Sequence, residues 1–544
     1  MRGFLIIITF LLFVAIPSAF SQAEETASKK IKGKHKIKMS QARHEYLNGN
    51  PRVALNLFRE VHRDIPKNAT VNYRIAECHY AINNKELAVE YFKNALSLNE
   101  KVDKQAYFWY GMSLHRNGQL DEAFSAFEKF KATAKPAQLK QTHADHYIAQ
   151  INEAKLQMSK PINVSLKNLG ENVNSRFDDY SPSITADGKT MIFTSRRPDT
   201  QGGKVDEKSD NKYFEDIYIS HFDEKENTWS EAEPIPGKIN TVGHDASLGI
   251  SKDGSMIFVY RNDGNLYIGD IFLSKISVSS NKWSTPKPLS KTVNSSYFES
   301  SASLSPDGKT LYFVSERPKG SVGHADIYMS KRISKYNWTE PKNLGPVINS
   351  KEDEISVFIH PDGKTLFFSS KGNKSMGGYD IFMSRMNDDS TWTEPMNLGY
   401  PINTVDDDLH FVLSADYKTA YYSSIRPEGM GERDLYEIDF SHYDIMQGMG
   451  AKLSILKGKV LINDTSLTNI PKIEITDSET GKTIFAIETD DESREYFITL
   501  TGDKKYKVTA SASGHKSVTE EMYIPYTTEK TFVMEKVFDL PPTP

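Results

Sequence analysis

The chain of 544 residues carries 67 Lys and Arg against 72 Asp and Glu, and its formal net charge is −5. A charge this close to balance gives no reason to expect nucleic acid or a strongly charged partner. The single cysteine, Cys78, excludes an intramolecular disulfide. We expect it to be a small buried helix residue, because domains of ordinary size bury enough apolar surface to fold without cross-links.

The first residues predict export. Arg2 precedes an apolar run from Phe4 to Ile16, and small residues follow it, as in a secretory signal peptide over residues 1–21. The run is shorter than the ~20 apolar residues of a membrane-spanning helix. We therefore expect a periplasmic protein, either soluble or peripherally associated with the outer membrane. The basic segment 22–39 is predicted to be disordered and solvated, with contact to an anionic membrane surface as the alternative.

Residues 40–158 are predicted to be helical and repetitive. Ala54, Ala88 and Ala123 occupy equivalent places at steps of 34 and 35 residues. The segment resembles tetratricopeptide repeats, whose period is 34. The resemblance implies an α-solenoid that binds protein partners in a concave groove. The amphipathic segment 138–158 is expected to cover the end of the helical stack, as solenoids require.

Three side chains of that last segment are of the types that ligate metals: His143, Asp145 and His146. Structural metal sites usually need a fourth protein ligand, and an ordinary solvated helix face explains the same residues. We therefore expect no metal there, and no cofactor elsewhere in the chain.

Residues 162–440 are predicted to form one β domain, in which residues 174–440 repeat one pattern five times. Its clearest copy, Ser-Pro-Asp-Gly-Lys-Thr-Leu-Tyr-Phe-Val-Ser at 305–315, places an Asp-Gly hairpin turn before a run typical of strands. Each copy predicts four short antiparallel strands, which together form one blade of a β-propeller. One strand of each copy opens at an Asp, at steps of 54, 56, 54 and 54 residues: Asp216, Asp270, Asp326, Asp380 and Asp434. Four copies carry a tryptophan that is predicted to pack between blades: Trp229, Trp283, Trp338 and Trp392.

The strand count also predicts how the propeller closes. The fifth copy lacks the strand that ends the other four, and a spare strand lies before the first copy at 164–170. We expect this strand to complete the last blade and so to leave no open sheet edge. The prediction is a five-bladed propeller, with a sixth, degenerate blade as the alternative.

The C-terminal part is predicted to be a separate all-β domain. After a linker at 441–451, residues 452–535 contain about seven short strand patterns, which favour a small β-sandwich. Residues 536–544 are predicted to be an unstructured tail. The predicted fold class is therefore multidomain, a helical solenoid followed by two all-β domains.

An acidic residue or cluster precedes the first strand of every copy in the repeated region. Equivalent positions of a propeller converge on one face, so these carboxylates could form a negative funnel that holds Ca²⁺ or a basic peptide. The alternative is that each acid caps the turn of its own blade by accepting backbone N–H groups. The triple clusters favour binding, because one acid is enough for capping. The candidate residues are Asp178, Asp179, Asp245, Glu299, Glu352, Asp353, Glu354, Asp406, Asp407 and Asp408.

Two further resemblances concern the β-rich regions. The five copies resemble the WD40-like, TolB-type propeller repeat, through Ser-Pro-Asp-Gly-Lys-x-Leu-x-Phe-x-Ser. Residues 452–535 are similar to the carboxypeptidase regulatory-like domain, through Gly458-x-Val460 and Tyr496-Phe497. The order of the three modules resembles Bacteroidetes envelope proteins of the type IX secretion and gliding machinery. That group normally carries a C-terminal OmpA-like peptidoglycan-binding domain, which this sequence does not show, so direct peptidoglycan binding is not expected.

The familiar sequence signatures of enzymes do not occur in the chain. It has no Gly-x-Ser-x-Gly, no His-Glu-x-x-His and no phosphate-binding Gly-rich loop. We therefore expect a non-enzymatic periplasmic scaffold or adaptor that binds protein subunits of an outer-membrane-associated complex. The alternative is a periplasmic peptide- or glycan-binding or sensing protein that uses the propeller channel. A propeller hydrolase with an unrecognised site is a third interpretation.

Overall fold

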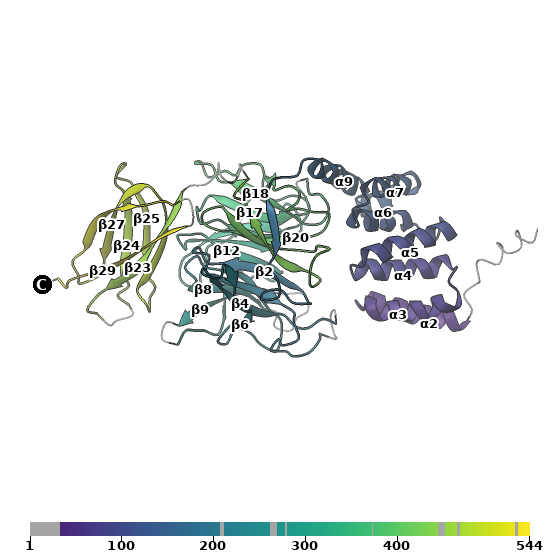
Figure 1. Ribbon diagram of the computed structural model, residues 1–544, viewed down its shortest axis with the longest axis horizontal. Coiled ribbons are helices and arrows are strands. Elements are labelled where there is room, and N and C mark those ends of the chain that lie inside the picture. The colour runs from purple at the N-terminus through teal and green to yellow at the C-terminus, as the bar shows by residue number, and fades with distance from the viewer. Residues whose placement is uncertain are drawn as a thin grey trace, which may run out of the picture. The chain divides into compact units, whose positions relative to one another are not determined.

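The computed structural model describes residues 33–206, 211–261, 269–277, 280–372, 374–443, 446, 452–464, 468–527 and 531–543 (Figure 1). The predicted signal peptide and most of the predicted linker lie outside these residues. The chain divides into two compact units, Met1–Ile148 and Ala149–Pro544. Within the described ranges, no helix has both the length and the apolar character needed to cross a membrane.

The first unit is built from helices that pack in consecutive pairs, α2 with α3, α4 with α5 and α6 with α7. Asn68 and Asn84 begin α4 and α5 by accepting the N–H groups of Val71 and Leu87, as N-cap residues do. Its helices are α2 Gly33–Leu47, α3 Pro51–Asp64, α4 Ala69–Ala81, α5 Lys85–Leu98, α6 Ala106–Arg116, α7 Leu120–Thr133 and α8 Pro136–Thr142, and α9 Ala144–Met158 begins in this unit and ends in the second.

The repeated alanines lie where the pairs pack most closely. Ala54, Ala88 and Ala123 are fully buried on α3, α5 and α7, the second helix of each pair. A larger side chain at these positions would push the paired helices apart. The contact between Gly111 of α6 and Phe127 of α7 is equally close. There a Cβ added to Gly111 would lie 3.2 Å from the ring of Phe127. The predicted helical repeat is confirmed.

Two predictions about the first unit are wrong in detail. The segment expected to stay disordered up to residue 39 is helical from Gly33, because α2 packs on α3 and buries His35 against Asp64. The single capping helix expected over 138–158 is broken into α8 and α9. The break falls at His143, whose φ of 51° ends α8 in the left-handed region.

The second unit contains five antiparallel sheets in which consecutive strands are neighbours. The first two sheets are β2 Asp179–Ile184, β3 Thr190–Ser195, β4 Asp216–Asp223, β5 Thr228–Trp229, β6 Glu233–Pro234; and β7 Asp245–Ile250, β8 Met256–Arg261, β9 Asp270–Ser277, β10 Lys282–Trp283, β11 Lys287–Pro288. The other three are β12 Glu299–Leu304, β13 Thr310–Ser315, β14 Asp326–Lys331, β15 Lys342–Asn343; β16 Glu354–Ile359, β17 Thr365–Ser370, β18 Asp380–Arg385, β19 Met396–Asn397; and β20 Asp408–Leu413, β21 Thr419–Ser424, β22 Asp434–Asp439 with β1 Ser165–Asn168.

These sheets form a closed ring, which we call the sheet ring. Their first strands β2, β7, β12, β16 and β20 contact one another in that order, and β20 contacts β2. One backbone hydrogen bond recurs at every step, from the N–H of the first residue of each of these strands to the preceding sheet. The five bonds are Asp245 to Glu215 O at 2.9 Å, Glu299 to Gly269 O at 3.0 Å, Glu354 to Ala325 O at 2.9 Å, Asp408 to Tyr379 O at 2.7 Å and Asp179 to Arg433 O at 2.9 Å.

The predicted closing strand is confirmed. Strand β1 pairs antiparallel with β22, with Ser165 opposite Asp439 and Asn168 opposite Tyr436. The last sheet is therefore completed by residues that precede the first, which removes an exposed sheet edge.

The recurrent tryptophans pack against the preceding sheet, as predicted. Trp229 of the first sheet meets Tyr421 of the last, with ring centroids 5.6 Å apart. Trp392 of the fourth sheet meets Tyr312 of the third at 6.3 Å. Large aromatic rings thus fill the wedge between neighbouring sheets.

A recurrent asparagine, absent from the residues predicted to be important, bonds each sheet to the segment that leaves it. Asn349 accepts the N–H of Ile327 at 2.8 Å and donates to its carbonyl at 3.0 Å, so one amide satisfies both backbone groups. The equivalent residues do the same in the other sheets: Asn174 with Leu435, Asn240 with Ile217, Asn294 with Ile271 and Asn403 with Ile381.

The C-terminal residues form two sheets over one buried apolar cluster. The predicted tail is wrong, because β29 continues to Asp539. Leu540 is buried and donates its N–H to Leu461 O at 3.0 Å, and Thr543 donates to Gly514 O at 2.9 Å. The strands are β23 Leu453–Leu461, β26 Glu495–Thr501 and β29 Phe532–Asp539 in one sheet, and β24 Lys472–Asp477, β25 Thr483–Glu488, β27 Lys504–Ser511 and β28 Val518–Ile524 in the other.

The asparagine contact predicts a measurable loss of stability. Asn349→Ala leaves the buried N–H of Ile327 without a partner, whereas its C=O still accepts the N–H of Leu344 at 3.1 Å, so the free energy of unfolding should fall by roughly 1–3 kcal/mol. Denaturant unfolding followed by tryptophan fluorescence measures this, since four of the five tryptophans lie in the sheet ring. The control is Asn387→Ala at an exposed loop position. Equal midpoints for the two variants would contradict the assigned role.

Candidate binding surfaces

Five of the ten candidate carboxylates are fully buried and cap the turns of their own sheets. Glu299 is typical: it accepts the N–H of Ser295 at 2.8 Å and the hydroxyls of Ser295 and Ser315 at 2.5 and 2.7 Å. The capping alternative is therefore what the structure shows, and these residues do not face a funnel. The buried set is Asp179, Asp245, Glu299, Glu354 and Asp408.

Arginine neutralises three of the buried carboxylates directly. The pairs are Arg197 with Asp179 at 2.9 Å, Arg261 with Asp245 at 2.6 Å and Arg317 with Glu299 at 3.2 Å. The fourth sheet has Lys371-Gly372 after β17, where the third sheet has Glu316-Arg317 after β13. Burial without an arginine partner raises the pKa of Glu354 to about 7. Burial also raises the pKa of Asp408 to about 7, although Arg426 opposes the shift.

The other five candidates are less buried on average but are engaged with neighbours. Lys212 lies 2.6 Å from Asp178, and His324 lies 3.4 Å from Asp353. Asp407 accepts the N–H of Tyr379 at 3.2 Å. Glu352 and Asp406 also interact with neighbouring groups, and Asp406 is buried. The set therefore consists of paired side chains and does not form a row of free acids.

No group of three or more candidate ligands within the described ranges is arranged to hold a metal ion. His143, Asp145 and His146 form no such group. Asp145 pairs with Lys131 at 2.7 Å, and His143 occupies the break between α8 and α9.

A cavity of about 380 Å³ lies among the first strands of the five sheets, and we call it the axial cavity. At one end the Tyr180 hydroxyl donates to Glu215, which lies 3.0 Å from His244. Burial lowers the pKa of His410, another lining residue, to about 3, so this imidazole is neutral. Lys252, from the turn after β7, lines the cavity as well. The volume is within the ~300–1,000 Å³ usual for small-molecule sites.

The helical unit carries a continuous surface of arginine and aromatic side chains on α2, α4 and α6. Between α2 and α4, Glu77 bonds Arg74 at 2.6 Å and Arg43 at 3.4 Å. Between α4 and α6, the rings of Tyr80 and Trp109 meet edge to face at 5.4 Å. We call this surface the arginine–aromatic face; its members are Arg43, Tyr46, Arg74, Glu77, Tyr80, Trp109 and Arg116.

The members of this face are half-buried, not fully covered. The guanidinium groups of Arg43 and Arg116 lie over the rings of Tyr46 and Tyr80, at 5.1 and 5.4 Å. Three arginines and one glutamate give the members of the face a formal charge of +2, part of which Asp103 offsets near Arg74. Such a surface suits a partner segment with acidic and aromatic side chains.

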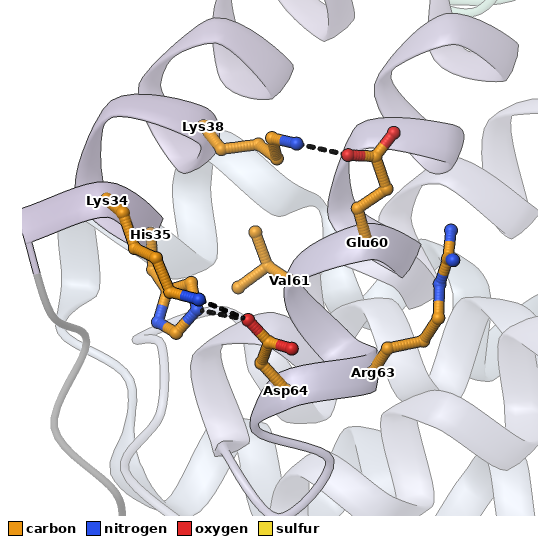
Figure 2. Close-up of a pocket in the computed structure, with 7 residues that line it drawn as sticks. All are labelled: Lys34, His35, Lys38, Glu60, Val61, Arg63 and Asp64. Carbon is orange, nitrogen blue, oxygen red and sulfur yellow. Dashed lines mark hydrogen bonds and ion pairs between the residues drawn. The ribbon is translucent and has the colours of Figure 1, made fainter.

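A hollow of about 460 Å³ lies between α2 and α3 in the helical unit. Figure 2 shows that its charges already pair across it: Lys34 and His35 both reach Asp64, and Lys38 reaches Glu60. The bonds from His35 and Lys34 lower the pKa of the Asp64 carboxyl to about 2. This hollow is better explained as the contact that docks α2 on α3 than as a ligand site.

The comparisons with known proteins bear mainly on the helical unit. The tetratricopeptide repeat model matches residues 39–101 and 82–138. The chaperone SycD of type III secretion from Yersinia enterocolitica is 18% identical over 23% of this chain and 90% of its own, with a TM-score of 0.22. For the β-rich part, a protein titled glycoside hydrolase is 9% identical over 53% of this chain and 94% of its own, with a TM-score of 0.36.

An α-L-arabinofuranosidase from Lactobacillus brevis is 14% identical over 52% of this chain and 94% of its own, with a TM-score of 0.32. No curated protein matches the chain. The N-terminal unit therefore carries tetratricopeptide repeats, which are protein-interaction modules, and a large all-β region follows it.

Glu299 of the third sheet pairs with Arg317, whereas Glu354 of the fourth sheet has no arginine partner. Replacing each glutamate by glutamine should therefore have opposite effects on stability. Folded Glu354 holds its proton up to about pH 7, whereas a glutamate in water loses it near 4.5, so its contribution to the free energy of unfolding falls as pH rises between these values. Glu354→Gln should remove that fall and be neutral or stabilising at pH 8. Glu299→Gln should cost about 3 kcal/mol, because it leaves Arg317 without its carboxylate. Denaturant unfolding at pH 5 and pH 8 checks both; equal losses at pH 8 would contradict this explanation.

Proposed function

We propose that the protein is a non-enzymatic scaffold or adaptor of the periplasm that binds protein subunits of an outer-membrane-associated complex. The observation that carries the proposal is the arginine–aromatic face. It runs over the first helices of three successive pairs in a unit that carries tetratricopeptide repeats.

Half-buried arginines and aromatic rings suit such a role for two reasons. They contribute a large contact area, and a partner that covers them removes charge-assisted hydrogen bonds and cation–π contacts from water. Edge-to-face packing of Tyr80 on Trp109 and the placement of Arg116 over Tyr80 hold these side chains in position before a partner binds. Less conformational entropy is then lost on association.

The assignments of the two β-rich regions and of the type IX machinery rest on sequence resemblance. The sheet ring is, we infer, a five-bladed WD40-like propeller, and the C-terminal sheets are a small β-sandwich of the carboxypeptidase regulatory-like kind. The signal-peptide pattern of residues 1–21 supports a periplasmic location. The order of modules supports a place in the type IX secretion or gliding machinery.

The second candidate function is a periplasmic peptide- or glycan-binding or sensing protein. The axial cavity favours it, because its volume suits a small ligand and its lining mixes hydroxyl, aromatic and charged groups. A scaffold retains its partners without added ligand, whereas a sensor does not require a stable partner.

Co-purification from envelope fractions tests the adaptor function. Trp109→Ala and Arg116→Ala should each reduce recovery of outer-membrane proteins by at least about tenfold if the face is an energetic centre of the interface. The matched control is Lys93→Ala, which removes an exposed charge from α5 outside the face. Circular dichroism confirms that each variant folds. Unchanged recovery with folded Trp109→Ala and Arg116→Ala would overturn the assignment.

A further inference from the structure

The turn after β7 departs from the pattern of the other four copies at one position. Lys252 precedes Asp253-Gly254, where every other copy has a small or cyclic apolar residue. The equivalent residues are Ala186, Pro306, Pro361 and Ala415. Because the repeat folds without a lysine there four times, the turn itself does not require Lys252.

The surroundings of Lys252 make its presence costly. The side chain is 8% exposed, and its ammonium lies 4.1 Å from the ring centroid of Phe358. Within the described ranges, the ammonium makes no hydrogen bond or ion pair, and Asp362 acts on it only at longer range. That carboxylate is already held by the hydroxyls of Tyr417 at 2.6 Å and Thr365 at 2.7 Å. Burial consequently lowers the pKa of the Lys252 amine to about 7.

Two serine hydroxyls lie at the same end of the axial cavity as Lys252. Ser183 accepts the N–H of Ile250 at 2.9 Å, two residues before the lysine. Ser303 accepts the N–H of Ile359 at 3.0 Å, next to the phenylalanine that the ammonium contacts. Because each oxygen already accepts from backbone, its O–H proton is suited to donate to a ligand. Lys252 and these hydroxyls together supply donors for one anionic group.

Further along the cavity, two more serines have unused hydrogen-bonding capacity. The hydroxyl oxygens of Ser247 and Ser356 are buried and have no hydrogen-bond partner among the described residues. Both residues line the axial cavity together with the aromatic side chains of Tyr260 and Phe298. A buried hydroxyl without a partner costs about 1–3 kcal/mol, and these two differ from others of the described residues, such as Ser369, in that they line a cavity. Because their oxygens are covered, these side chains must turn toward the cavity to bond a ligand, and a ligand with hydroxyl groups and apolar C–H faces would match them and the two aromatic rings.

We infer that the axial cavity is a binding site for a small hydroxylated monocarboxylate, of the size and class of a uronic acid. Lys252, Ser183 and Ser303 hold the carboxylate, and Ser247 and Ser356 bond hydroxyls of the ligand body. Lys252 brings one positive charge to the lining and Glu215, at the end near Tyr180, brings a negative one, so the cavity suits a singly charged carboxylate better than a doubly charged phosphate. This inference does not depend on the adaptor function, since it concerns a different unit of the chain.

Calorimetric titration of the full-length protein with D-glucuronate tests the site. D-Glucose, which has a hydroxymethyl group in place of the carboxylate, should bind at least about tenfold more weakly, because it cannot pair with Lys252. Inorganic phosphate is the second comparison. Equal binding of glucose, stronger binding of phosphate, or no saturable binding of glucuronate at millimolar concentration would each overturn the inference.

Lys252→Ala provides the matched variant, because it gives copy two the residue that copies one and five carry naturally. We expect it to abolish glucuronate binding and to leave the unfolding temperature equal or higher, since it removes a buried charge. Lys282→Ala, which removes an exposed lysine of β10 in the same sheet, should change neither. Retained binding in Lys252→Ala would show that the lysine does not hold the ligand, and a marked loss of stability would show that it serves the fold; either result would overturn the inference.

Discussion

Closure of the sheet ring depends on the carboxylate residue that begins the first strand of each sheet. Its backbone N–H bonds the preceding sheet, and its side chain accepts from the turn that leads into its own strand, as Glu299 does with Gly269 and Ser295. A buried carboxylate is costly unless it is paired and hydrogen-bonded. An arginine forms an ion pair with this carboxylate in three sheets, and a serine or threonine hydroxyl donates to it in all five. The ring is therefore held together by polar contacts repeated at each sheet and by aromatic side chains packed between neighbouring sheets.

The sequence predicted the strands, the turns and the closing strand, because each has a local signature. Even the fifth turn, which has Tyr417 where other copies have glycine, keeps the left-handed conformation with φ of 62°. Its hydroxyl bonds Asp362 of the preceding sheet, which helps to offset the strain. The helix over 33–39 and the strand up to Asp539 could not be predicted in the same way. Both are held by contacts with segments distant in sequence, at Asp64 and Leu461.

The candidate site was harder to predict than the fold. Acids repeated at one position indicate a ring of charge, but the same repetition is expected of a structural cap. The burial of each carboxylate and its hydrogen-bond partners decide between a binding ring and a structural cap. Neither property can be predicted from the spacing of the acids in the sequence. The recurrent asparagines carried a readable signal, an apolar residue followed by Asn and Ser or Thr in every copy, as in Ile348-Asn349-Ser350. Lys252 carried the opposite signal, because it breaks a pattern that the other copies keep.

A partner-binding face on α2, α4 and α6 is the proposal on which the adaptor function depends. A photo-crosslinking amino acid placed at Tyr80, in cells that express the full chain, tests it most directly. We expect a discrete crosslinked product with an envelope protein from that position, and none from Asn94, an exposed residue of α5 outside the face. Products from both positions alike, or from Asn94 and not from Tyr80, would contradict the claim.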